Sequence, residues 1–225
     1  MTELITAVLF DLYETLVTER ETRPTRASSL GERLGLDAAG FRKAWKLQRA
    51  KVVRGQVSFA DALLEIGTML GRTLDASLVQ GLSEERRLEK AAVFQTIGAE
   101  VLGGLCQLHN CGFKLAVISN CFAEDAEAWP RCHAAEYFDA SVFSFEVGAA
   151  KPEPEIYREA MRRLGVESSN AVFVGDGGDD ELLGAERAGV RAAQAVWFRG
   201  ELVGLPPYIP RLVSWPSVLE LATAG

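Results

Sequence analysis

Five short apolar runs, each about as long as a β-strand, are separated by segments with helical periodicity, and this alternation limits the possible folds more than any other feature. The runs lie at residues 5–11, 113–119, 140–145, 171–176 and 191–198. The helical segments lie at 99–110, 153–165 and 181–189. Strands that are apolar on both faces need cover on both faces, which helices between parallel strands supply. The sequence therefore predicts an α/β fold, a doubly wound parallel sheet with helices on each side.

The interval from about residue 20 to residue 92 interrupts this alternation. It has helical periodicity, at 37–53, 59–70 and 77–91, and contains no segment typical of a strand. We therefore expect an all-helical domain at 20–92, inserted into a core domain made of residues 1–19 and 93–225. Basic residues are dense in the insert, and most are expected on a solvent-exposed helix face. They are Arg42, Lys43, Lys46, Arg49, Lys51 and Arg54.

Composition narrows the classes of partner. The net charge of -7 and the pI near 5.1 argue against nucleic acid and against an anionic membrane surface. A small anionic substrate is still compatible, because a local group of cations can reverse the field inside one cleft. No signal peptide or long apolar span is apparent, so we expect a cytoplasmic protein, either a monomer or a homodimer. The four cysteines form no CxxC pair, which favours reduced thiols over a zinc site.

Polar residues follow the predicted strands at the point where each strand ends. In open α/β sheets the ligand binds beyond the carboxyl ends of the strands, so these residues are candidates for one shared site. The first run ends at Asp11 and the second at Ser119 and Asn120, and Lys151 follows the third. The fourth is followed by Asp176, Asp179, Asp180 and Glu181.

Several carboxylates gathered at one place raise one another's pKa unless a cation neutralises them. A set of ligands made only of oxygen atoms suits Mg²⁺, which typically takes one or two carboxylates together with substrate phosphate oxygens. We expect Asp11 and Asp176 to form such a site, together with either Asp180 or Glu181 and with a backbone carbonyl, for which we choose that of Tyr13.

The remaining groups suit a phosphoryl ligand. Lys151 is a compact cation that can contact both the nucleophilic carboxylate and a substrate phosphate. The hydroxyls of Ser119 and Thr15 and the amide of Asn120 are neutral donors suited to the other phosphoryl oxygens. We therefore expect these four residues to hold the transferred group.

Four motifs carry a resemblance to a known family. FDLYETL (10–16), VISN (117–120), KP (151–152) and VGDGGDDELLGAERAG (174–189) are similar, in this order, to motifs of the haloacid dehalogenase-like hydrolase superfamily. The resemblance spans nearly the whole chain. It implies that Asp11 is a nucleophile that forms an aspartyl intermediate, that Ser119 and Lys151 orient the transferred group, and that the acids after the fourth strand hold Mg²⁺. The helical insert would be a subclass I cap domain, which closes over the site and selects the substrate.

The first motif resembles one branch of the family. Most phosphatases of the family have a second aspartate two positions after the nucleophile, as general acid and base, whereas this chain has Tyr13. A phenol with an ordinary pKa near 10 replaces it poorly. DLYETL instead resembles the 2-haloacid dehalogenases, whose halide leaving group needs no proton. Glu14 stands where the family usually has glycine, and is either a substitute acid near the substrate or a solvent-facing turn residue.

Other positions agree with the dehalogenase branch. Asn120 directly follows Ser119, and Tyr157 lies six residues after Lys151. Trp45 aligns with a Trp-Arg pair in the cap of these dehalogenases. Lys46 would then replace the arginine that binds the substrate carboxylate, although a lysine cannot contact a carboxylate through two parallel hydrogen bonds.

The fourth motif favours a phosphatase. The dehalogenases are metal-independent and have a neutral residue in place of Asp176, which without a metal would suppress the ionisation of Asp11. A missing general acid costs on the order of two to four decades in rate, and less for a good leaving group. We therefore predict a Mg²⁺-dependent phosphatase of a small phosphorylated metabolite that forms an aspartyl phosphate. The alternatives are a metal-independent 2-haloacid dehalogenase that forms an aspartyl ester, and a binding protein without turnover.

Overall fold

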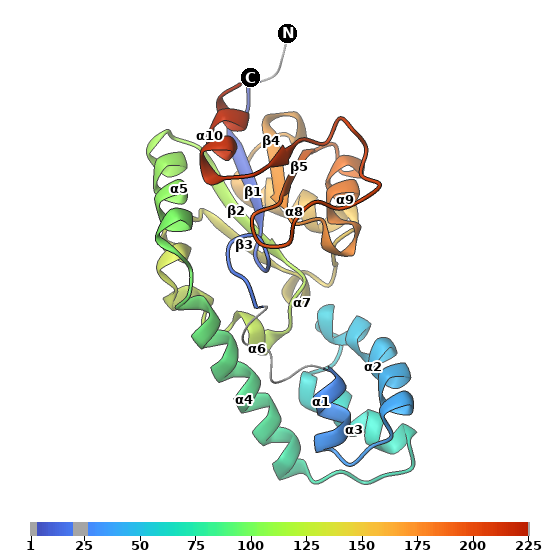
Figure 1. Cartoon of the computed structure of the whole chain (residues 1–225). Coiled ribbons are helices and arrows are strands. Elements are labelled where there is room, and N and C mark those ends of the chain that lie inside the picture. Colours follow the sequence, from blue (N-terminus) through green and yellow to red (C-terminus); the bar gives the residue numbers. More distant parts are fainter. Residues whose placement is uncertain (1–3, 20–26, 225) are drawn as a thin grey trace.

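A parallel six-stranded sheet forms the centre of the computed structural model, which describes residues 4–19 and 27–224 (Figure 1). Its strands are β1 (Ala7–Asp11), β2 (Lys114–Ser119), β3 (Ala140–Phe143), β4 (Ala171–Gly175), β5 (Arg191–Ala195) and β6 (Arg211–Leu212). They lie in the order β3-β2-β1-β4-β5-β6, and every neighbouring pair is parallel. The predicted doubly wound parallel sheet is therefore confirmed, and β6 is a strand that the apolar pattern did not indicate.

Helices cover both faces of the sheet. Helices α5 (Ala99–Asn110) and α10 (Trp215–Thr223) pack on one face, and α8 (Pro154–Leu164) and α9 (Glu181–Arg187) pack on the other. Alternate residues of β1 point to opposite faces of the sheet. Val8 and Phe10 belong to the apolar core under α5 and α10, and Ala7 and Leu9 belong to the core under α8 and α9. Both faces of a central strand are thus buried, which explains why its sequence is a continuous apolar run.

Four helices between β1 and β2 form the cap, which lies beyond the carboxyl ends of the strands (Figure 1). They are α1 (Ala27–Arg33), α2 (Ala38–Val53), α3 (Phe59–Met69) and α4 (Ala76–Phe94). Asp37, Ser58 and Asp75 cap the last three by accepting hydrogen bonds from free backbone N–H groups. The expected start of the insert at residue 20 lies outside the described residues, and its expected end at residue 92 falls inside α4.

The cap has an apolar core of its own, and two residues of the sheet domain enter it. Phe41, Phe59 and Leu63 are buried at its centre, together with Phe122 and Ala150 from loops after β2 and β3. The cap is therefore packed directly against the edge of the sheet domain that carries the strand ends.

Shorter elements complete the chain. They are α6 (Ala123–Ala126), α7 (Ser144–Val147) and 3₁₀ turns at Trp129–Arg131, His133–Tyr137, Ser168–Asn170 and Gly178–Asp180. The four cysteines are free thiols. Within the described ranges no single helix is both long enough and apolar enough to cross a membrane. Helices α4 and α5 meet these two conditions only when they are taken together, and they are bent by 70° relative to each other.

Candidate active site

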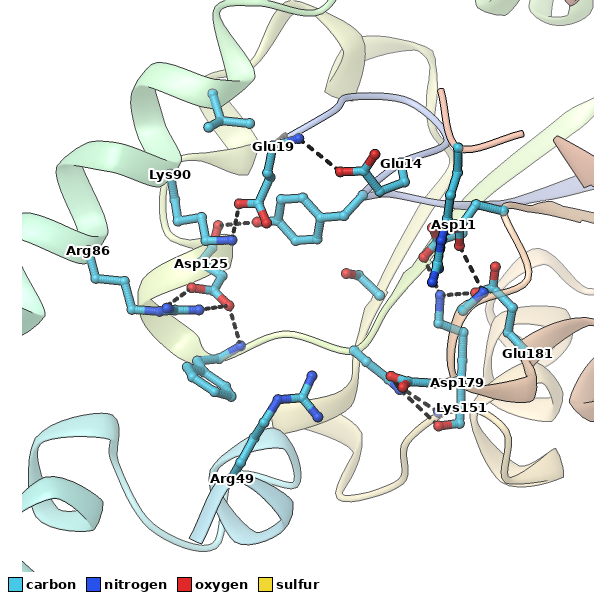
Figure 2. Close-up of a pocket in the computed structure, with 18 of the residues that line it drawn as sticks. Asp11, Glu14, Glu19, Arg49, Arg86, Lys90, Asp125, Lys151, Asp179 and Glu181 are labelled. Carbon is cyan, nitrogen blue, oxygen red and sulfur yellow. Dashed lines mark hydrogen bonds and ion pairs between the residues drawn. The ribbon is translucent and has the colours of Figure 1, made fainter. Parts of the chain in front are cut away.

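A cleft of about 610 Å³ lies between the cap and the carboxyl ends of the strands (Figure 2). Its position follows from the topology, because β1 lies between β2 and β4 and the chain leaves the centre of the sheet in opposite directions from there. Most of the predicted site residues line it: Asp11, Tyr13, Glu14, Ser119, Asn120, Lys151, Asp176 and Glu181. The predicted Thr15, Lys46 and Asp180 do not belong to this lining.

Asp11, at the end of β1, lies at the centre of the polar contacts. The Lys151 ammonium donates to Oδ1 of Asp11, and Thr15 Oγ1 donates to Oδ2 at 3.2 Å. Lys151 also donates to Oε2 of Glu181 at 2.6 Å. All four side chains are buried, so these charges interact with little screening by water. Thr15 therefore fixes the orientation of Asp11, whereas the sequence-based expectation made it a ligand of the phosphoryl group.

Three carboxylates, those of Asp11, Asp176 and Glu181, each bring an oxygen atom within 4.8 Å of the others. Burial raises the pKa of Asp11, Lys151 lowers it, and Asp176 raises it further. Burial and the charge of Asp11 raise the pKa of Glu181 well above its usual range, against the effect of Lys151. Because the three acids are buried, crowded and all oxygen donors, they fit a hard divalent cation such as Mg²⁺.

The pKa of Lys151 is raised although the side chain is buried. Burial alone would lower it, but the charges of Asp11 and Glu181 outweigh that effect. Lys151 is thus a permanent cation at neutral pH. Asn120 holds its backbone in place, because the amide accepts from Lys151 N at 2.7 Å and donates to Lys151 O at 2.8 Å.

Ser119 is the predicted donor whose hydroxyl is left for a ligand. Its Oγ is buried and has no hydrogen-bond partner among the described residues. The Asn120 amide, by contrast, contacts the Lys151 backbone and, at 3.3 Å, Asp179 Oδ2. An unpaired buried hydroxyl at a strand end is costly unless something binds it, which supports a role for Ser119 in substrate contact.

Asp176 has two partners of its own. Gly178 N donates to Oδ1 at 2.9 Å, and Arg199 Nη1 donates to Oδ2 at 2.7 Å. Arg199 was not among the predicted site residues, although it directly follows the fifth apolar run and residues at strand ends are candidates for the site. Within residues 4–19 and 27–224, Lys151 and Arg199 are the two cations that contact the carboxylates of this cluster.

The loop after β4 decides between two predicted metal ligands. Asp179 and Asp180 adopt left-handed backbone conformations, with φ of 51° and 54°, and Asp180 is exposed. Glu181 then begins α9 with its side chain buried, and Gly177 N donates to its Oε1 at 2.9 Å. Of the two alternatives, the structure therefore brings Glu181 to Asp11 and Asp176 and turns Asp180 outward. The Tyr13 carbonyl as a ligand stays a prediction.

Tyr13 packs between the cap and the sheet domain. Its ring stacks on Phe94 with centroids 6.3 Å apart, and Lys90 Nζ lies 4.0 Å from the ring centre. Its hydroxyl makes one long hydrogen bond, 3.5 Å to the carbonyl of Asp125. Burial, followed by the nearby Asp125 charge, raises the pKa of Tyr13 well above its usual value. The phenol is therefore an even weaker acid than an ordinary tyrosine.

Glu14 is part of a tight turn rather than a solvent-facing residue. Its φ is 63°, a left-handed conformation that costs a non-glycine residue roughly 1–2 kcal/mol and that explains the glycine usual at this position. The side chain is only 8% exposed and accepts from Thr18 Oγ1 and Glu19 N, both at 3.0 Å. The expected alternative of an exposed turn residue is thus wrong.

The basic residue of α2 that lines the cleft is not the one that the sequence predicted. Lys46 is exposed and lies outside the cleft, whereas Trp45 and Arg49 line it. Trp45 and Arg49 are four residues apart and share one face of the helix, from which Lys46 is turned away by about 100°. The structure therefore does not bring Lys46, the predicted substrate contact, to the cleft.

Two ion pairs on the cap side of the cleft were not predicted from the sequence. Arg86 Nη2 donates to Asp125 Oδ2 at 2.8 Å and its Nε lies 2.6 Å from Oδ1, while Lys90 forms an ion pair with Glu19 (Figure 2). The Arg86 guanidinium also lies over the ring of Phe122, 4.5 Å from its centre. These contacts join α4 of the cap to the segments that follow β1 and β2.

Relatives of the chain are known from sequence. The profile of the haloacid dehalogenase-like hydrolase family matches residues 5–189. The glyceraldehyde 3-phosphate phosphatase of Methanopyrus kandleri is 44% identical over 92 residues, 40% of this chain and 40% of that protein. The pyrophosphatase PpaX of Halalkalibacterium halodurans is 36% identical over 119 residues, 51% of this chain and 54% of that protein. The chain thus spans about two fifths to half of the length of these curated relatives.

Similarity in structure extends over both domains. A 2-haloacid dehalogenase from Pseudomonas syringae pv. Tomato superimposes with a TM-score of 0.72 and 25% identity, over 99% of this chain and 100% of that one. The family profile covers most of the chain and includes β1, the cap and the acidic loop after β4. The chain accordingly belongs to the haloacid dehalogenase-like hydrolase family.

Proposed function

We propose that the protein is a Mg²⁺-dependent phosphatase of a small phosphorylated metabolite. The observation that carries this proposal is the buried cluster of Asp11, Asp176 and Glu181, whose oxygen atoms approach within 4.8 Å of one another. The pKa of Asp11 is raised by burial and by Asp176, so a nucleophile at this position needs more positive charge than Lys151 alone provides. A divalent cation held by the three carboxylates meets that need.

Each residue of the site has a definite task in this reaction. Asp11 attacks phosphorus, the ester P–O bond breaks, and the alcohol leaves with the bonding electron pair and takes up a proton. Water then attacks the aspartyl phosphate at phosphorus, which releases inorganic phosphate and restores the carboxylate. Lys151 and the Ser119 hydroxyl bind the phosphoryl oxygens as charge develops on them. Asp11, Asp176 and Glu181 would hold Mg²⁺, which would supply positive charge that stabilises the charge developing on the phosphoryl group.

The names of the relatives divide between two functions. The two curated proteins reported above are a phosphatase and a pyrophosphatase, while the structural neighbour is a 2-haloacid dehalogenase. Tyr13, in place of an aspartate, also favours dehalogenation, so a metal-independent 2-haloacid dehalogenase that forms an ester with Asp11 is the second candidate. The acidic cluster favours the phosphatase, because Asp176 and Glu181, unlike Asp11, have no task in a dehalogenation without metal.

Two parallel assays separate these functions. In the first, hydrolysis of para-nitrophenyl phosphate is measured with Mg²⁺, and we expect a rate that vanishes when a chelator is added. In the second, chloride release from 2-chloropropionate is measured with the chelator, and we expect none. Asp11→Asn is the negative control for both assays. Chloride release that the chelator leaves unchanged, without phosphate release, would overturn the proposal in favour of the dehalogenase.

A further inference from the structure

The segment that presents Lys151 to Asp11 contacts the cap on both sides of the lysine. Ala150, directly before it, is 4% exposed and belongs to the apolar core of the cap. Glu153, two residues after it, forms a salt bridge with Arg54, which directly follows α2. Neither Arg54 nor Glu153 lines the cleft. Any influence of this pair on the reaction is therefore exerted through Lys151 rather than by contact with the substrate.

The carboxylate of Glu153 binds the cap and its own segment at the same time. Its Oε1 accepts a hydrogen bond from Nη2 of Arg54, and its Oε2 accepts one from the backbone N–H of Ala150 at 3.1 Å. The N–H of Glu153 also donates to the carbonyl of Ala150 at 2.8 Å. Burial would raise the pKa of Glu153, but the hydrogen bonds from Arg54 and Ala150 outweigh burial and lower that pKa. The ionised side chain thus closes a turn around Lys151 and joins this turn to the cap.

The other contacts of Lys151 come from the sheet domain. Asp11 and Glu181 accept from its ammonium group, and Asn120 exchanges two hydrogen bonds with its backbone. These contacts are the same wherever the cap lies. The salt bridge of Arg54, by contrast, reaches the segment of the lysine from the cap and depends on how the two domains are packed.

The residue after Arg54 allows the end of α2 to approach the sheet domain closely. Gly55 has a φ of 66°, and a Cβ atom at this position would lie 2.1 Å from the carbonyl oxygen of Phe145 in α7. Glycine, which has no Cβ, fits both this conformation and this contact. Arg54 also donates from Nη1 to the carbonyl of Ala50 at 3.0 Å. The close approach and this hydrogen bond together hold the guanidinium at Glu153.

We propose that Arg54 is a positioning residue of the reaction, which acts through Glu153 to hold Lys151 in place beside Asp11. The inference rests on the proposed phosphatase function and extends its machinery to the cap, because α2 then helps to place the lysine that binds the phosphoryl oxygens. An error of 1 Å in the position of a reacting or catalytic group can lower a rate about 100-fold. The charge that Lys151 stabilises develops in the transition state, so loss of the salt bridge acts mainly on kcat.

Steady-state kinetics on para-nitrophenyl phosphate with Mg²⁺ test the inference. Arg54→Ala and Glu153→Gln should each lower kcat roughly three- to tenfold with little change in KM. The double variant should lose no more than either single variant, because all three lack the same salt bridge. Arg54→Lys restores the charge and should recover part of the loss. Arg33→Ala removes an arginine whose ion pair with Glu85 lies within the cap, and this control should match the wild type.

A further variant disturbs the same contact without removing a charge. Gly55→Ala places a methyl group against the carbonyl of Phe145, which forces the end of α2 away from α7. We expect its kcat to fall as it does in Arg54→Ala, again with little change in KM. A variant that keeps the kcat of the wild type while its Cβ is accommodated would contradict the role of this close approach in placing Arg54.

Hydrogen exchange of backbone amides tests the placement of the lysine without substrate or metal. The amides of Ala150 and Lys151 should exchange roughly two- to fivefold faster in Arg54→Ala than in the wild type, which is the range expected for the loss of a partly exposed ion pair. The rates are compared with that of Val117, inside β2, which corrects for a change in global stability. Equal relative rates in the two proteins would overturn the inference.

Three kinetic results would also overturn the inference. They are wild-type kcat in both single variants, a loss that appears in KM alone, and a double variant whose loss is the product of the two single losses. Failure of the proposed function looks different, because the wild type then does not hydrolyse para-nitrophenyl phosphate with Mg²⁺. In that case the exchange of the Ala150 and Lys151 amides still decides whether Arg54 holds the segment of the lysine.

Discussion

Lys151 donates to Glu181 Oε2 at 2.6 Å while the same nitrogen contacts Asp11, so one buried lysine links the first residue of α9 to the end of β1. Asn120 in turn fixes the backbone of Lys151 to the end of β2. The ammonium group thus joins the end of β1 to the start of α9, and the backbone of the same lysine joins them to the end of β2. The electrostatics of the site depend on this group and on the second cation, Arg199.

Removing the lysine should destabilise the fold. Lys151→Met leaves Asp11 and Glu181 buried without their cation, and breaking a buried pair in this way typically costs about 3–5 kcal/mol. We expect a loss of that size in the free energy of unfolding, measured by urea denaturation in the presence of a chelator. Lys46→Met removes an exposed lysine and should change the free energy of unfolding by less than about 0.5 kcal/mol. Equal losses in the two variants would contradict the linking role of Lys151.

The raised pKa of Glu181 predicts a pH dependence of stability. Because the folded pKa lies above the unfolded value of about 4.3, the folded state binds the proton more tightly. The contribution of Glu181 to stability is therefore complete at pH values below the unfolded pKa, and it is lost as the pH rises through the folded pKa. Without metal, the unfolding free energy of the wild type minus that of Glu181→Gln should fall as the pH rises from about 4. Urea titrations across this range test it, and a difference that rises with pH would contradict it.

Arg199 is expected to weaken metal binding. It places a positive charge 2.7 Å from Asp176 Oδ2, next to the carboxylate cluster that fits a divalent cation. Arg199→Gln removes this repulsion and should tighten Mg²⁺ binding on the order of tenfold, about 1.4 kcal/mol. Calorimetry measures the affinity, with Arg191→Gln at the opposite end of β5 as the control. Weaker binding in Arg199→Gln would show instead that the arginine orients Asp176 as a ligand.

Tyr13 is expected to limit the rate on substrates with poor leaving groups. Tyr13→Asp restores a carboxyl group at the place of the missing general acid and should raise kcat for alkyl phosphates on the order of two decades, with a smaller effect on aryl phosphates. Tyr13→Phe should leave both rates nearly unchanged, because the hydroxyl makes only one hydrogen bond of 3.5 Å. Steady-state rates on glycerol 3-phosphate and para-nitrophenyl phosphate give the comparison. A loss of activity in Tyr13→Asp on both substrates would exclude this explanation.

The fold was predictable from the sequence because its strands are buried on both faces. Continuous apolar runs indicated β1 to β5, and the rule that ligands bind beyond the carboxyl ends of parallel strands predicted that Asp11, Lys151 and Asp176 lie together. β6 has two residues, too few for any periodicity, and its strand conformation depends on pairing with β5.

The polar side of the cap could not be predicted in the same way. Apolar periodicity identifies the buried face of a helix, but it does not say which polar neighbour faces a cleft and which faces solvent. Arg49 and Lys46 are both basic residues of the same helix, and the sequence does not show which of them faces the cleft. The packing of Trp45 against Phe59 and Phe122 places the face with Arg49 at the cleft. The pairing of Arg86 with Asp125 joins residues 39 positions apart and depends on how the two domains meet.

The most direct test of the account is a calorimetric titration of Mg²⁺ into the substrate-free protein. The wild type should bind one ion per chain, and Asp176→Asn should lose affinity on the order of tenfold or more, because it removes one carboxylate of the buried cluster. Asp61→Asn, in the cap, is the control and should bind as the wild type does. Absence of Mg²⁺ binding to the wild type, or equal affinity in Asp176→Asn, would contradict the assignment of this cluster as the metal site of a phosphatase.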